Sequence, residues 1–273
     1  TAPSSITAQG TVKADGGTGV LTLGDGDTGL AVAGNLQVGG TSTGTISLGD
    51  ATIADGFRLT VGTGAANQID LDAIAGTASG TASNLTINTT GVVTVAEAVS
   101  TDIANVTVTQ SGGTTFEAVD TTTDVVLTNT TGTIAFNGLL NTPTLTTASQ
   151  GYGVSLKGGS TITNAVTFSN TGTTQIGDAT ADTNTFNDGV TATAGAVTAA
   201  GSVVTSADNL VLGAVTLVDG QNLILTTNAG GGGNITVGSI TGVAGGTAEN
   251  VTLVSGTGTI GVTGNIGTDI ATL

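Results

Sequence analysis

Hydrophobic and polar residues alternate in short runs along this chain of 273 residues. A period of two puts successive side chains on opposite faces of an extended backbone, so each run predicts a half-buried β-strand. Successive runs usually start about eight to sixteen residues apart. The apolar members of these runs are Leu21 and Leu23, Leu36 and Val38, Ile46 and Leu48, Leu59 and Val61, Ile69 and Leu71, Leu85 and Ile87, Val93 and Val95, Val106 and Val108, Ile134 and Phe136, Val154 and Leu156, Val166 and Phe168, Leu210 and Leu212, Val215 and Leu217, Leu223 and Leu225, Ile235 and Val237, Val251 and Leu253, and Ile260 and Val262.

Glycine, Asn, Asp and Ser gather between the runs, for example at Gly16-Gly17, Gly39-Gly40 and Gly158-Gly159. These residues favour turns, because glycine tolerates positive φ and short polar side chains bond to nearby backbone. No window combines a helical period of 3.6 with capping residues, and the abundant Thr, Val and Gly are poor helix formers. The pattern predicts an all-β protein.

Composition selects between a sandwich array and a solenoid. The chain has five Phe, one Tyr and no Trp, Met or Cys, whereas the thick core of a sandwich is commonly anchored by Trp or Tyr. Small and β-branched residues suit a narrow core of stacked coils. Three similar corners, Leu23-Gly24-Asp25, Leu48-Gly49-Asp50 and Ile176-Gly177-Asp178, support stacking, and the first two lie 25 residues apart, a plausible length for one coil. The sequence therefore predicts a β-solenoid.

An internal repeat spans several coils. Residues of about 56–106 correspond in sequence to residues of about 220–273, and the offset drifts by only about three residues. Thr1 and Ala2 also align with Thr193 and Ala194, which places the first residue inside a repeat. We expect residues 1–273 to form a single continuous β-solenoid segment and to be a fragment of a longer array.

The charge is strongly acidic. Three basic residues, Lys13, Arg58 and Lys157, stand against nineteen acidic ones, for a formal net charge of −16. Nucleic acid is excluded as a partner because phosphate binding draws on clustered Lys and Arg. We also expect no direct membrane insertion, since no apolar run reaches the roughly 18 residues of a membrane span.

Four stretches resemble the strand repeats of a known group of bacterial surface proteins. They are AVTFSNTG (165–172), IGDAT (176–180), TFNDGVTA (185–192) and NVTL (250–253). They are similar to repeats of filamentous-haemagglutinin-like adhesins and autotransporter passengers. The resemblance implies a right-handed parallel β-helix, export to the bacterial cell surface, and a role in adhesion, biofilm or surface coating.

Catalytic and metal chemistry have few candidates. The chain has no His and no Cys, which removes Ser-His-Asp and Cys-His arrangements, and we expect no enzymatic activity and no cofactor. Asp25 with Asp27, and Asp70 with Asp72, place two carboxylates two residues apart and are candidate Ca²⁺ ligands. Neither pair matches an EF-hand loop, so a solvated turn and an outward strand face are the favoured interpretations.

The sequence thus predicts a structural or adhesive protein of the bacterial surface or extracellular space, acting as a stiff stalk or filament segment. Its partners would be further copies, associating head to tail or laterally, or a glycan or protein on a host or surface. Two alternatives stay open. One is a β-helix that binds or cleaves carbohydrate, and the other is a phage or virion fibre.

Overall fold

A computed structural model describes residues 4–25, 27–228 and 230–273. None of these residues is helical, and the strands run parallel in a β-solenoid with about 12 turns among the described residues. The all-β solenoid fold predicted from the sequence is therefore confirmed. The chain divides into two compact units, residues 1–135 and 136–273. Thr1, Ala2 and the Gly26 between Asp25 and Asp27 lie outside the described residues.

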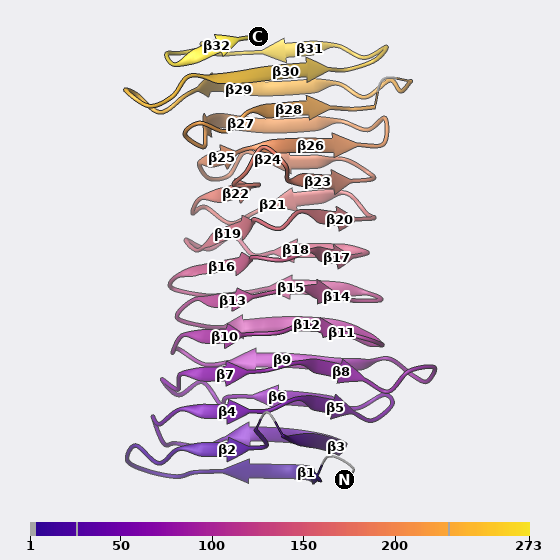
Figure 1. The fold of residues 1–273 in the computed structure, drawn as a ribbon, viewed down its shortest axis with the longest axis vertical. Helices are drawn as coiled ribbons and strands as arrows, with labels where there is room; N and C mark the ends of the chain where they lie inside the picture. The colour runs from indigo at the N-terminus through magenta and orange to yellow at the C-terminus, as the bar shows by residue number, and fades with distance from the viewer. Residues whose placement is uncertain (1–3, 26, 229) are drawn as a thin grey trace. The chain divides into compact units, whose positions relative to one another are not determined.

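Unit 1 consists of short strands joined by turns (Figure 1). They are β1 (Ser4–Lys13), β2 (Leu21–Leu23), β3 (Thr28–Gly39), β4 (Ile46–Leu48), β5 (Ala51–Ile53), β6 (Arg58–Val61), β7 (Ile69–Leu71), β8 (Ile74–Gly76), β9 (Ser83–Asn88), β10 (Val93–Val95), β11 (Val99–Ser100), β12 (Ile103–Gln110), β13 (Thr114–Phe116), β14 (Val119–Asp120), β15 (Asp124–Leu127) and β16 (Thr133–Phe136), in which the boundary falls.

Each coil of unit 1 holds three strands, and each strand pairs with its counterparts in the neighbouring coils. One row is β2-β4-β7-β10-β13, a second is β3-β5-β8-β11-β14, and a third is β3-β6-β9-β12-β15. The long β3 belongs to two rows because it turns a corner without a break. Ile46, Ile69, Val93 and Thr114 occupy one position in successive coils, so a coil takes 21 to 24 residues here.

Unit 2 repeats this plan. Its strands are β17 (Leu140–Thr142), β18 (Thr144–Thr147), β19 (Gly153–Leu156), β20 (Ser160–Ile162), β21 (Val166–Phe168), β22 (Thr174–Ile176), β23 (Thr183–Phe186), β24 (Val190–Ala192), β25 (Val197–Ala199), β26 (Gly201–Thr205), β27 (Leu210–Leu217), β28 (Leu223–Thr226), β29 (Ile235–Thr241), β30 (Glu249–Val254), β31 (Ile260–Val262) and β32 (Ile270–Thr272). Its pairings, such as β20 with β23 and β27 with β29, are again parallel.

Apolar and polar residues alternate in the sequence because successive residues of a strand face the core and the surface in turn. In β10, Val93 and Val95 are fully buried and Thr94 is exposed, and most other strands follow the same pattern. All of the predicted apolar pairs lie in strands. Outward positions form rows as well: Thr60, Thr86 and Thr107 follow one another on β6, β9 and β12.

A row of buried polar side chains accompanies the apolar core at one turn of unit 1. The row consists of Ser42, Asn67, Thr89, Ser111 and Thr130, each at most 6% exposed. Asn67 donates to the carbonyl oxygens of Ser42 and Gly44, and Thr130 donates to the Ser111 carbonyl oxygen at 2.6 Å. These bonds satisfy buried carbonyl groups of the preceding coil, which would otherwise be costly to bury. They tie one turn to the next without a hydrophobic contact.

The corner motif stacks as the sequence predicts. Leu23 pairs with Leu48, and the Gly49 amide donates to the Leu23 carbonyl oxygen at 3.0 Å. Gly24 has a φ of 81° and Gly177 a φ of 77°, a conformation that residues with a Cβ rarely adopt. Gly49 lacks a positive φ, but a Cβ there would lie 2.7 Å from the Asp25 amide nitrogen. Two of the corners thus need glycine for its backbone and the third for space.

Candidate functional site

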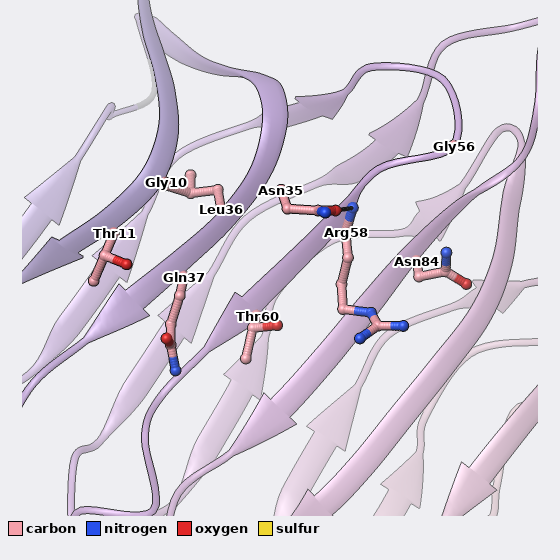
Figure 2. A pocket seen from close by; sticks show the side chains of 9 residues that line it. All are labelled: Gly10, Thr11, Asn35, Leu36, Gln37, Gly56, Arg58, Thr60 and Asn84. Carbon is pink, nitrogen blue, oxygen red and sulfur yellow. Dashed lines mark hydrogen bonds between the residues drawn. The ribbon is translucent and has the colours of Figure 1, made fainter.

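An open polar groove of about 520 Å³ lies on unit 1. Its walls come from β1, β3, β6 and β9 and from the turn before β6, so four coils contribute (Figure 2). The lining residues are Gly10, Thr11, Asn35, Leu36, Gln37, Gly56, Arg58, Thr60 and Asn84.

A row of long polar side chains crosses the groove at one register position. Arg58 pairs with Asn84, and Asn84 pairs with Asn105. The Arg58 backbone amide donates to Asn35 Oδ1 at 3.0 Å, and Asn105 Nδ2 donates to Asn84 Oδ1 at 2.5 Å. Hydrogen bonds between coils therefore hold the Asn side chains of this row, and they fix the position of the Arg58 backbone.

A second row of hydroxyl and amide groups runs beside the first. Thr11, Gln37 and Thr60 are aligned on β1, β3 and β6. They point outward, because their strand neighbours Leu36 and Val38 are buried. The groove therefore offers donors and acceptors at regular intervals over a rigid, backbone-paired floor.

Arg58 supplies the positive charge of the groove. Within residues 4–25, 27–228 and 230–273 the ion pairs are Lys13 with Asp15 and Lys157 with Asp178, so the Arg58 guanidinium has no carboxylate partner there. Figure 2 shows its side chain extended between Thr60 and Asn84. A guanidinium presents five donors in a planar fork that fits a carboxylate. The residues that line the groove include no carboxylate, so the groove is equipped to bind and orient a polar ligand.

Asp25 and Asp27, two of the predicted Ca²⁺ candidates, line a smaller cavity of about 250 Å³ together with Asp50. Asp25 Oδ1 accepts hydrogen bonds from the amides of Asp27 (3.1 Å) and Thr28 (2.9 Å). This oxygen is therefore engaged in stabilising a tight turn, which is the use expected of Asp at such a position.

Asp70 and Asp72 lie elsewhere. Asp70 is on the outward face of β7, where Gln68 Nε2 donates to both of its carboxylate oxygens at 3.2 and 3.0 Å. Asp72 follows the strand, and its backbone amide donates to the Leu48 carbonyl oxygen. The pair Asp25 and Asp27 and the pair Asp70 and Asp72 thus lie at different places in unit 1. Among the described residues no three acidic side chains lie close enough together to hold a metal ion.

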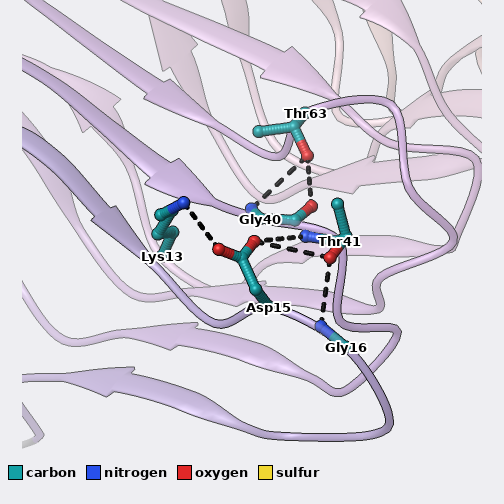
Figure 3. Close-up of polar contacts among 6 residues, drawn as sticks. All are labelled: Lys13, Asp15, Gly16, Gly40, Thr41 and Thr63. Carbon is teal, nitrogen blue, oxygen red and sulfur yellow. Dashed lines mark hydrogen bonds and ion pairs between the residues drawn. The ribbon is translucent and has the colours of Figure 1, made fainter.

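A polar corner near the start of unit 1 joins three successive coils (Figure 3). Lys13 Nζ lies 2.6 Å from Asp15 Oδ2, while Asp15 Oδ1 accepts from the Thr41 backbone amide at 3.2 Å. Thr63 donates to the Gly40 carbonyl oxygen at 2.6 Å. The hydrogen bond from Lys13 and then that from Thr41 lower the pKa of Asp15, and Asp15 raises the pKa of Lys13. Both groups are exposed, so the pair contributes little to stability.

A comparison with protein families, with characterised proteins and with solved structures finds no match to this chain. The solenoid is compatible with β-helix repeat proteins. No helix that could cross a membrane occurs in the part of the chain that the structure describes.

Arg58 is the single arginine of the sequence, but the sequence alone does not place it in a groove. The groove depends on register, because it joins residues 35, 58 and 84 at intervals of 23 and 26 that differ with loop length. The recurring Asn residues, Asn35 in β3 and Asn84 in β9, are the signal that could have pointed to it.

Proposed function

We propose that the chain is a structural and adhesive part of a bacterial surface or extracellular fibre, in which its coils act as a stiff segment that resists tension. The observation that carries this proposal is the coil-to-coil bonding inside each unit. Parallel backbone pairing joins every strand row, and side-chain hydrogen bonds such as Asn67 to Ser42 add a second connection.

The energetic pattern favours such a role. Each coil contacts its neighbours over its whole length, so stability accumulates coil by coil. A thin core of Val, Ile and Leu with aromatic residues at only 2% of the sequence leaves little room for a deep cavity. The net charge of −16 keeps a long surface soluble and discourages aggregation.

Single-molecule stretching of the full chain tests this proposal. Because neighbouring coils are separately bonded, we expect unfolding in steps of about 70–90 Å, the extended length of one coil at about 3.3–3.6 Å per residue. A chain that unfolds at negligible force, without steps of this size, would not serve as a stalk under tension.

The Arg58 groove supports a second candidate function, the binding of carbohydrate that carries a carboxylate. Sugar recognition uses planar amides, hydroxyl groups and charge-assisted hydrogen bonds, and the groove presents Arg58, Asn35, Asn84, Gln37 and Thr60 in two aligned rows. Arg58 would hold the carboxylate in bidentate fashion, and the amides and hydroxyls would bond to the sugar hydroxyls.

Titration with a uronate oligosaccharide, and with the neutral oligosaccharide of the same linkage, tests the second candidate. We expect the uronate to bind more tightly, Arg58→Gln to abolish the preference, and Arg58→Lys to reduce it, because an ammonium lacks the bidentate fork. Lys157→Gln is the matched control, since it removes a positive charge from unit 2 that is paired with Asp178. If Arg58→Gln bound the uronate as tightly as the unsubstituted chain does, this groove would not be the binding site.

A further inference from the structure

Unit 2 contains the one Asn-Gly step of the chain, Asn137-Gly138. Glycine has no side chain to shield its amide nitrogen, so this nitrogen can approach the side-chain carbonyl carbon of the preceding Asn closely. Asn129, by contrast, is followed by Thr130, whose branched side chain hinders the same approach. Position 137 is therefore where the sequence makes an asparagine side chain most reactive toward its own backbone.

The structure places this step at an exposed corner. β16 ends at Phe136 and β17 begins at Leu140, and both of these residues are fully buried. Between them Asn137 is exposed, and Leu139 is 50% exposed. The core thus holds the two ends of the corner, while the side chain of Asn137 faces solvent.

Neither reacting group is held by a hydrogen bond. Within residues 4–25, 27–228 and 230–273 the Asn137 side chain has no hydrogen-bond partner, and the Gly138 amide nitrogen has no acceptor. Two other asparagines of unit 2 are engaged, since Asn164 donates to Thr144 Oγ1 at 2.9 Å and Asn187 Oδ1 accepts from the Ser206 hydroxyl at 3.2 Å. The Asn137 side chain can therefore rotate toward Gly138 without breaking a bond of the fold.

The next coil covers the backbone of this corner. Its own corner, between β19 and β20, has the same length of three residues, 157–159. A Cβ on Gly158 would press against the Asn137 carbonyl oxygen and against the Gly138 Cα atom. The two corners are thus in contact backbone to backbone, with no room for a methyl group between them.

Two hydrogen bonds hold the ends of the Asn137 corner to that coil. The Lys157 amide donates to the Phe136 carbonyl oxygen at 2.9 Å, and the Leu140 amide donates to the Gly159 carbonyl oxygen at 3.2 Å. Leu140 is also the residue at which β17 begins to pair with β20. The corner therefore spans two fixed points with a fixed number of main-chain atoms.

We propose that Asn137 is a site of spontaneous deamidation, which converts it to isoaspartate and loosens the coil stack at this corner. The Gly138 nitrogen attacks the side-chain carbonyl carbon of Asn137, a nitrogen–carbon bond forms, and the bond from that carbon to Nδ2 breaks. The departing NH₂ group takes up the Gly138 amide proton and leaves as ammonia, and a succinimide ring remains. This step needs no second protein, metal or oxidant.

Water then opens the ring. Its hydroxyl adds to one of the two ring carbonyl carbons, its remaining hydrogen goes to the ring nitrogen, and the bond between that carbon and the nitrogen breaks. Cleavage at the main-chain carbonyl makes the chain run through the former side chain of residue 137, so that the main chain gains one carbon atom. Cleavage at the side-chain carbonyl gives ordinary aspartate, which adds a negative charge but no length.

The isoaspartate form does not fit the corner. The added carbon cannot lie under Gly158, because the backbones are already in contact there. It therefore pushes one end of the corner away, and the bond from Lys157 or the bond from Leu140 is lost. Because each coil is stabilised mainly by its neighbours, a break at one corner lowers the stability of the coils on either side.

Ageing of the folded full chain at mildly alkaline pH tests the reaction, because base promotes loss of the Gly138 amide proton. Peptide mapping by mass spectrometry should show the mass gain of an NH₂-to-OH exchange at Asn137 before any other asparagine. Isoaspartate methyltransferase should label the same peptide. Asn137→Gln should stay unmodified, since its longer side chain would have to close a larger and less favourable ring. If Asn137 stays intact in the folded chain, whether or not it reacts in urea, the proposal is overturned.

Thermal unfolding of the aged chain tests the effect on the fold. Ion exchange separates the deamidated chain by its added negative charge, and its isoaspartate fraction should unfold at a lower temperature than the unaged chain. Freshly prepared Asn137→Asp has the same charge without the added main-chain carbon, and it should keep the unfolding midpoint of the unsubstituted chain. If the isoaspartate fraction and Asn137→Asp unfolded at the same temperature, the corner would accept the extra atom and the loosening of the stack would be refuted.

Discussion

Asn67 donates from its side-chain amide to the carbonyl oxygen of Ser42, 25 residues earlier, at a distance of 2.8 Å. The same nitrogen lies 2.7 Å from the Gly44 carbonyl oxygen, so one side chain fastens both sides of the turn in the preceding coil. Thr89 repeats this role one coil later, sharing its hydroxyl hydrogen between the carbonyl oxygens of Ala65 at 2.8 Å and Asn67 at 2.6 Å. The turns are thus joined by polar contacts where the apolar rows end.

Replacing Thr89 by Val should destabilise unit 1 by about 1–3 kcal/mol, because it keeps the side-chain shape but removes the hydroxyl that donates to the Asn67 carbonyl oxygen and accepts from the Gly91 amide. The free energy of unfolding from urea titration measures this. Thr107→Val is the control, since Thr107 lies on an outward row and should change stability by no more than about 0.5 kcal/mol. If both substitutions lowered the free energy of unfolding equally, the buried polar side chains at the turns would not be a specific source of stability.

Phe168 and Phe186 meet inside unit 2 with ring centroids 6.2 Å apart and planes at 82°. Both rings are buried, so Phe186→Ala should cost about 3–5 kcal/mol, mostly from the cavity that it leaves. A double-mutant cycle with Phe168→Ala should return a coupling of about 0.5–1.5 kcal/mol for the edge-to-face contact. Strict additivity would mean that the rings do not interact beyond their burial.

Gly177 should not accept a side chain. Its φ is 77°, and a Cβ there would press against the Ala200 carbonyl oxygen of the next coil. We expect Gly177→Ala to lower stability by more than about 1 kcal/mol. Gly151→Ala is the matched substitution in the same unit, because no atom lies within 4 Å of a Cβ at that position. Thermal unfolding of the two variants compares them, and similar midpoints would contradict the corner geometry.

Tyr152 provides a pH test because it is the single tyrosine in the chain. Burial raises its pKa above the usual 10.0, and the hydrogen bond from the Ala148 amide lowers it by a smaller amount. The folded state thus holds the phenol proton more tightly than the unfolded state, so stability from this group is full below pH 10.0 and is lost as the pH rises through the folded pKa. In a titration with rising pH, tyrosinate absorbance should appear above the usual pKa of 10.0 and together with unfolding. Titration at the usual pKa in a folded chain would contradict the burial of the ring.

The strands that sequence reasoning found are those with Leu, Ile, Val or Phe at both inward positions. Most of the strands that were missed carry a small or polar residue inward, although β15, with Val125 and Leu127 buried, was missed as well. Ser160 in β20 and Thr174 in β22 are 1% and 2% exposed. Ser160 is satisfied by Asn184 Oδ1 at 2.9 Å and Thr174 by Asn170 Nδ2 at 3.2 Å. A polar residue can occupy the core where the neighbouring coil, as for Ser160, or the preceding turn, as for Thr174, supplies its partner. The pattern of a single strand does not contain that partner.

The candidate sites were harder to predict than the fold for a related reason. Asp residues paired closely in sequence were the predicted Ca²⁺ candidates. In the structure, however, Asp25 stabilises its own turn and Asp70 faces outward beside Gln68. Arg58 acquires its surroundings from residues more than 20 positions away, such as Asn35 and Asn84. Only the register between coils brings those residues together.

Electron microscopy of the full chain, purified without denaturation, tests the central claim most directly. A β-solenoid segment that resists tension is expected to appear as straight rods or as fibres built from them, with a repeat of about 4.8 Å along the axis from the spacing of paired strands. Compact particles without that repeat would contradict the account.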